Sequence, residues 1–155
     1  FGNGAERSLE NREVHGHFSG INFNIHHKGH LIRAAQEGIA FSFRYGLDIM
    51  KQLGMVFSVI RAGDSNLFKS RVFREAIVNS CNVDLEVYDT DGAQGAARGS
   101  GVGAGIFSSH GEALRGVKAK NRLQTRQETV REYESAYKRW KMNLSRILHK
   151  EHIPA

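Results

Sequence analysis

Apolar positions spaced by three or four residues predict a long helix in the first third of the chain. The stripe consists of Ile32, Ala35, Ile39, Phe43, Leu47 and Met50. This spacing places all six side chains on one side of a helix, and Gly54 stands where a helix stop is expected. We therefore expect a helix that ends near Gly54 and is buried along one broad face.

Shorter patterns predict three strands and a second helix. An alternating run at residues 14–23, the compact apolar run VFSVI at 56–60, and DLEVYD at 84–89 each have the length and composition of a strand. Between the last two, Asn66 is a plausible N-cap. The helix that follows it would have one apolar side, made of Phe68, Val72, Phe73, Ala76 and Ile77. Strands that alternate with helices predict a parallel or mixed sheet covered by helices.

The segment TDGAQGAARGSGVGAGIF, residues 90–107, holds six of the seventeen glycines and falls where the next helix is due. Asp91 can cap a helix there, with Gln94 three residues later. The larger side chains form a single stripe: Gln94, Arg98, Val102 and Ile106. Interior glycine costs roughly 1 kcal/mol per residue relative to alanine. Close approach of another helix would offset this cost, and it explains the spacing better than a flexible linker or a phosphate loop, whose Gly-Lys-Ser/Thr ending is absent.

Composition and charge narrow the class of protein. The chain has 155 residues, of which 40% are hydrophobic and 25% charged, as in one globular domain. It has no apolar run of about eighteen residues and no signal pattern, so we expect a cytoplasmic protein without membrane contact. The lone Cys81 is expected to pack in the core. Of the net charge of +6, residues 115–150 contribute eleven Lys or Arg against three Glu. We interpret them as a solvated face, because no nucleic-acid-binding motif accompanies them.

The end of the chain carries a further amphipathic stripe: Val130, Tyr133, Tyr137, Trp140, Leu144 and Ile147. We expect this helix to pack on its own chain, because most amphipathic helices in globular domains do so. A homodimer through the same stripe remains the alternative. A zinc site can also be drawn from the histidines His15, His17, His26, His27 and His30, although a surface or helix-start role fits their spacing better.

Three motifs together resemble a known family. They are RAAQEGIAF at residues 33–41, the aromatic–arginine pair Phe73-Arg74 after a glycine-bearing turn, and GAQGAA at residues 92–97. In this order and spacing the chain resembles, over residues 4–107, the C-terminal domain of the FGGY carbohydrate kinase family, closest to its xylulose kinases.

The resemblance implies an α/β fold, the ribonuclease-H-like domain of the actin-like ATPases. Residues 1–112 would form the second kinase domain, entered from a missing N-terminal domain, and residues 113–155 a basic helical tail packed on it. The implied activity is phosphoryl transfer from ATP, with Mg²⁺, to a pentulose such as D-xylulose. The family's catalytic aspartate and phosphate loops would lie upstream, so the chain alone is expected to be inactive. The alternative is a non-catalytic nucleotide- or partner-binding module of the same fold.

The resemblance also implies two sets of site residues. The expected nucleotide-binding positions are Ala62, Gly63, Asp64, Ser65, Asn66 and Ser70. The helix expected to cross its counterpart near the interdomain hinge carries Gly92, Gly95, Ala96, Ala97 and Gly99. The loop departs from the family, which usually has two or three consecutive glycines there. Since a carboxylate would repel phosphate, we expect Asp64 to point to ribose, to a cap or to solvent.

Overall fold

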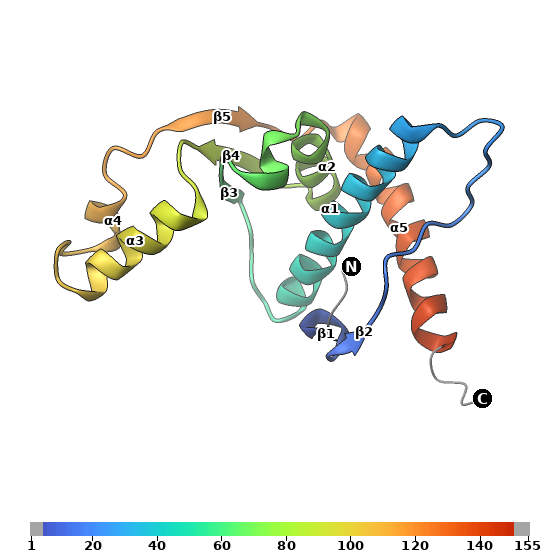
Figure 1. Cartoon of the computed structure of the whole chain (residues 1–155), viewed down its shortest axis with the longest axis horizontal. Helices are drawn as coiled ribbons and strands as arrows, with labels where there is room; N and C mark the ends of the chain where they lie inside the picture. The colour runs from blue at the N-terminus through green and yellow to red at the C-terminus, as the bar shows by residue number, and fades with distance from the viewer. Residues whose placement is uncertain (1–4, 151–155) are drawn as a thin grey trace.

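The computed structural model describes residues 5–150, which include a three-stranded sheet and several helices (Figure 1). In chain order the elements are β1 (Ala5–Glu6), the 3-10 helix η1 (Arg7–Leu9), β2 (Arg12–Glu13), α1 (Lys28–Gln52), β3 (Val59–Gly63), the 3-10 helix η2 (Asn66–Lys69), α2 (Arg71–Cys81), β4 (Asp84–Tyr88), α3 (Gly92–Gly103), α4 (His110–Ala113), β5 (Ala119–Leu123) and α5 (Gln127–Lys150). Helices α3 and α4 lie at the opposite end of the molecule from α5 (Figure 1).

The sheet is mixed, with β4 at its centre. Strand β3 runs parallel to β4, and β5 runs antiparallel to it on the other side. The predicted strand at 84–89 is confirmed as β4, whereas the predicted strand at 56–60 lies about three residues later, as β3. The sequence did not predict β5, because most of its residues are polar and exposed at the sheet edge.

The long helix α1 is confirmed, but its predicted burial is only partly right. It ends at Gln52, and Gly54 follows with a φ of +86°, a conformation that favours glycine. The fully buried residues of the helix are Ala40 and Phe41. Of the predicted stripe, Ile32 is 58% exposed and Phe43 is 53% exposed.

Helix α2 begins later than expected, because Ser70 and not Asn66 caps it. The Ser70 hydroxyl accepts a hydrogen bond from the Phe73 amide at 3.4 Å, while Asn66, with a φ of +49°, opens the short helix η2. The predicted apolar side is largely correct, since Phe73, Ala76 and Ile77 are buried.

The prediction of a strand at residues 14–23 is wrong. Strand β2 ends at Glu13, and the segment up to α1 is irregular. Val14 is buried in a small cluster with Leu9 and with Leu144 of α5. The segment is therefore anchored on a helix at its start, where the alternating pattern had indicated a sheet partner.

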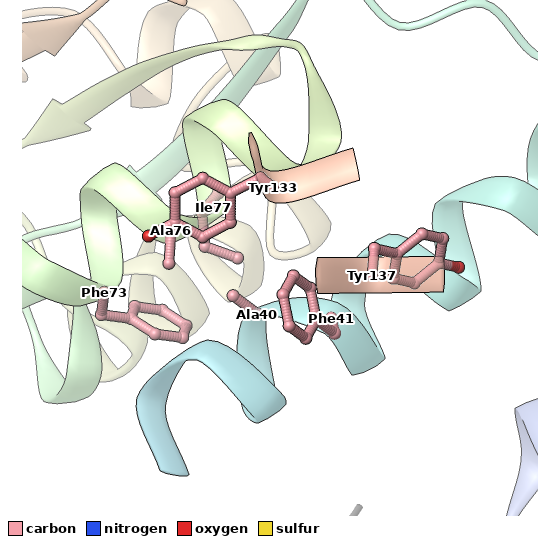
Figure 2. Close-up of a cluster of buried hydrophobic side chains, with 7 residues drawn as sticks. All are labelled: Ala40, Phe41, Phe73, Ala76, Ile77, Tyr133 and Tyr137. Carbon is pink, nitrogen blue, oxygen red and sulfur yellow. The ribbon is translucent and has the colours of Figure 1, made fainter. Parts of the chain in front are cut away.

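The core joins three helices. Figure 2 shows the cluster, in which residues of α1 and α2 face residues of α5: Ala40, Phe41, Phe73, Ala76, Ile77, Tyr133 and Tyr137. The α5 stripe thus packs on the chain's own α1 and α2. A polar layer borders this contact, because Tyr137 donates to Asp48 at 2.7 Å and Arg44 pairs with Glu134 at 2.5 Å.

Candidate functional site

The parallel strands β3 and β4 bring two loops to one edge of the sheet. Gly63, the last residue of β3, lies beside Tyr88, the last residue of β4. The next amide, of Asp64, donates to the Tyr88 carbonyl at 2.9 Å and links the two strand ends. In open α/β sheets, ligands bind in the crevice outside the carboxyl ends of the strands. This edge is therefore the candidate site.

A cavity of about 1000 Å³ opens at this edge and extends beneath β3. Of the predicted nucleotide-binding residues, those that line it are Ala62, Gly63, Ser65 and Asn66, together with Gly92 of the predicted hinge set. Most of the remaining wall is apolar and comes from α1, η2 and α2. Asp64 and Ser70 are not among the lining residues.

Asp64 is held in ion pairs. Its carboxylate lies 3.4 Å from the Arg74 guanidinium and 3.2 Å from the Lys120 ammonium group, which also lies 2.9 Å from Asp89. Hydrogen bonds to Asp89 and Asp64 raise the pKa of Lys120 above its ordinary value. Because both cations offset the charge of Asp64, its carboxylate does not present a free negative charge to a ligand in the cavity.

Gly63 is required by the packing of the strand end. A Cβ at this position would lie 2.5 Å from the Thr90 carbonyl oxygen, well inside van der Waals contact. The glycine thus lets the end of β3 approach the segment that leads into α3. The resemblance assigned Gly63 to nucleotide space, and the structure adds this second reason.

Ser70 has a structural role that the sequence did not reveal. Besides capping α2, its hydroxyl donates to the Gln36 side chain of α1 at 2.5 Å. The Arg74 guanidinium donates to the carbonyls of Phe68 and Lys69 and so fixes η2. Gln36 and Lys120 were missed because each comes from a segment distant in sequence.

The glycine-rich segment forms the predicted helix, α3. The Asp91 carboxylate caps it by accepting from the Gln94 amide at 2.8 Å, and Arg98 donates to the Thr90 hydroxyl at 2.7 Å. The predicted hinge residues Gly92, Gly95, Ala96, Ala97 and Gly99 are all exposed. A Cβ at any of the three glycines would meet nothing within 4 Å. Within the described residues, nothing therefore packs against these three glycine positions.

Three of the histidines serve the start of α1. His27 caps the helix by accepting from the Gly29 amide at 3.1 Å, and His30 accepts from the His27 amide at 3.3 Å. His26 accepts from the Asn22 amide at 3.0 Å. In each case the Nδ1 atom is engaged with the backbone. Across residues 5–150, no group of three or more His, Cys, Asp or Glu side chains could hold a metal ion.

Helices that could cross a membrane are likewise absent from the described part of the chain. No protein-family model matches the sequence, and no curated protein matches it either.

Solved structures match it clearly. A xylulose kinase from Rhodospirillum rubrum is similar with a TM-score of 0.74 and 20% identity, over 90% of this chain and 29% of that one. A gluconate kinase from Lactobacillus acidophilus is similar with a TM-score of 0.67 and 19% identity, over 83% of this chain and 26% of that one. A glycerol kinase from Plasmodium falciparum, solved with ADP, gives a TM-score of 0.60 and 22% identity, over 83% of this chain and 26% of that one.

The common class of these structures is the sugar kinases of the FGGY type, which have the actin-like ATPase fold. The chain therefore has the fold of part of such a kinase. It spans less than a third of the length of the kinases it matches.

Proposed function

We propose that this chain is the C-terminal part of an ATP-dependent sugar kinase with D-xylulose as its acceptor. In that enzyme it supplies one wall of the nucleotide site and half of an interdomain hinge. The observation that carries the proposal is the match over 90% of the chain to a xylulose kinase, with a TM-score of 0.74. The sequence resemblance to the same group of kinases, drawn from motifs alone, supports it independently.

The nucleotide is proposed to contact the polar end of the cavity. Ser65 and Asn66 line the cavity beside Gly63, and Gly92, at the start of α3, lines it too. A cavity of about 1000 Å³ is ample for a nucleotide, since ligand pockets typically measure roughly 300 to 1,000 Å³. The ion pairs of Asp64 with Arg74 and Lys120 remove the repulsion that its charge would exert on phosphate.

The reacting groups are proposed to lie outside this chain. ATP with Mg²⁺ would supply the transferred phosphoryl group and the charge that stabilises its transfer. We assign the residues that bind Mg²⁺ to another part of the enzyme, as the resemblance to the kinase family implies. We also assign to that part the carboxylate that accepts the proton of the sugar hydroxyl.

Helix α3 is proposed to form the hinge. Its residues Gly95, Ala96 and Gly99 are exposed, and small side chains allow two helix backbones to approach closely. A counterpart helix from the other domain would cover these faces. The two domains could then pivot about the crossing as they close on ATP and the sugar.

Titration of the chain with ADP, followed by amide chemical shifts, tests the nucleotide wall. We expect the largest shifts in residues 63–66 and at Gly92. Asn66→Asp should weaken binding about fivefold or more, because it adds a negative charge that faces phosphate. Asn82→Asp is the matched control, since both asparagines are exposed and have left-handed backbones, with φ of +49° and +51°.

Equal effects of the two variants, or shifts spread away from the loop, would contradict the nucleotide wall. A coupled kinase assay of the chain with xylulose and MgATP should show no turnover above background. Turnover by this chain alone would show that its own residues include the reacting groups.

A further inference from the structure

Strand β5 is bulged beside the last residues of β4, at the edge of the sheet that holds the candidate site. Val87 of β4 lies opposite Asn121. The next residue of β4, Tyr88, lies opposite Ala119. Lys120 is therefore the extra residue of β5, without a partner in the register. A β-bulge changes the direction of a side chain, and bulges are common next to functional sites.

The Lys120 side chain reaches across the end of β4 to the loop that follows β3. Its ammonium group lies 2.9 Å from the Asp89 carboxylate and 3.2 Å from the Asp64 carboxylate. Because β4 lies between β5 and β3 in the sheet, this one side chain joins the ends of all three strands. The Asp89 amide also donates to the Lys118 carbonyl at 2.9 Å, which holds β5 in place for the contact.

Asp64 stands between residues that line the cavity, although it does not line the cavity itself. Gly63 before it and Ser65 after it are both lining residues. The backbone is held here, because the Asp64 amide donates to the Tyr88 carbonyl at 2.9 Å. The direction of the Asp64 side chain therefore decides whether its negative charge faces the cavity, and Lys120 is bound to that side chain.

We infer that Lys120 is a positioning residue of the nucleotide site, which holds the Asp64 carboxylate away from the phosphates of a bound nucleotide. This inference rests on the proposed function. Arg74 is the second cation beside Asp64, at the longer distance of 3.4 Å, and it also binds backbone carbonyls of η2. The sequence indicated only a helical tail for residues 113–155, and Lys120 gives this part of the chain a role in the nucleotide site.

Titration of single variants with ADP tests the inference. Lys120→Met should bind ADP about tenfold more weakly than the unmodified chain, because the released carboxylate would repel phosphate. Lys120→Arg keeps the positive charge and should bind within about threefold of the unmodified chain. Lys118→Met is the matched control, because it removes the same charge from an exposed lysine two positions away and leaves both ion pairs of Lys120 in place. Its affinity should stay within about twofold.

A second substitution shows whether Lys120 acts through Asp64. In the double variant Lys120→Met/Asp64→Asn, no carboxylate is left at position 64, so ADP should bind within about threefold of Asp64→Asn alone. A lysine that contacted phosphate directly would instead cost the same affinity with either residue at position 64. The Lys120 side chain is 49% exposed, so its replacement should leave the fold intact, and the amide spectra of α1 and α5 report this.

Two results would overturn the inference: equal ADP affinity in Lys120→Met and Lys118→Met, or an undiminished loss in the Asp64→Asn background. Amide shifts recorded without nucleotide separate the inference from the proposed function. Lys120→Met should move the amide signals of residues 63–66, and Lys118→Met should not. A chain that shows these shifts but binds no ADP would count against the nucleotide wall alone. ADP binding with unmoved loop signals would count against positioning by Lys120 alone.

Discussion

Replacing Trp140 with alanine should destabilise the chain without any dependence on protein concentration. Trp140 of α5 is packed against the two clusters that hold this helix, one with Phe41 and one with Leu144. Its ring stacks on Tyr137 at a centroid distance of 5.9 Å and lies 6.1 Å from Phe41 and 6.2 Å from Tyr45.

The magnitude follows from these contacts. Truncation of a buried tryptophan typically costs about 3 to 5 kcal/mol. Trp140 is only partly buried, so we expect a loss near the lower limit, about 3 kcal/mol. For a chain of this length, each kcal/mol lowers Tm by roughly 2 to 4 °C, which gives a decrease of about 6 to 12 °C. Met142→Ala is the control on the same helix, because Met142 is 54% exposed and its truncation should change stability by about 0.5 kcal/mol or less.

Thermal melts of the three proteins over a hundredfold range of concentration provide the assay. Since α5 packs on its own chain, Tm should stay constant across that range for each protein. A Tm that rises with concentration would indicate that association stabilises the fold. That result, or equal losses in Trp140→Ala and Met142→Ala, would refute the intramolecular packing energy assigned to Trp140.

Four further outcomes follow from individual contacts. Gly63→Ala should lower the free energy of unfolding, measured in urea, by about 1 to 3 kcal/mol, because its Cβ would overlap the Thr90 carbonyl. The control Gly92→Ala should leave that free energy unchanged, because the space around its Cβ is open. Equal losses in the two variants would contradict this explanation. Burial and the nearby Glu37 raise the pKa of Tyr133 from its ordinary value of 10.0 to about 12, so its contribution to stability is present below pH 10 and lost as the pH rises toward 12. Urea unfolding across that range should therefore show a smaller alkaline loss for Tyr133→Phe than for the unmodified chain, and parallel curves would exclude Tyr133 as the cause. His27→Ala should lower stability by about 1 kcal/mol through loss of the α1 cap, and His27→Asn should restore it; no recovery with asparagine would disprove the capping role. Ala96→Leu should change the free energy of unfolding of this chain by about 0.5 kcal/mol or less, since Ala96 is exposed. The same substitution should slow turnover of a kinase that contains the chain. An unchanged rate would argue against the hinge.

Local chemistry was enough to predict most of the helices. Three features located them: the stripe from Ile39 to Met50, the cap at Asp91 and the aromatic stripe of α5. Each depends on residues three or four positions apart, about one helical turn. A helix closes its backbone hydrogen bonds within its own segment, so its sequence pattern and its caps suffice to locate it. Strand β4 was predicted for a similar reason, because Leu85 and Val87 alternate toward the core.

Contacts between distant segments decided the rest. Strand β5 exists because β4 offers it backbone partners, and its own polar residues carry no strand pattern. Asp64 meets Lys120 across fifty-six positions, and Gly63 is constrained by Thr90 from the end of the next strand. Which face of α1 is buried depends on α2 and α5, so Phe43 remains exposed although its spacing matches that of the predicted stripe. Periodicity specifies which side chains share a face, but burial requires a second surface, and only the tertiary structure brings that surface into contact.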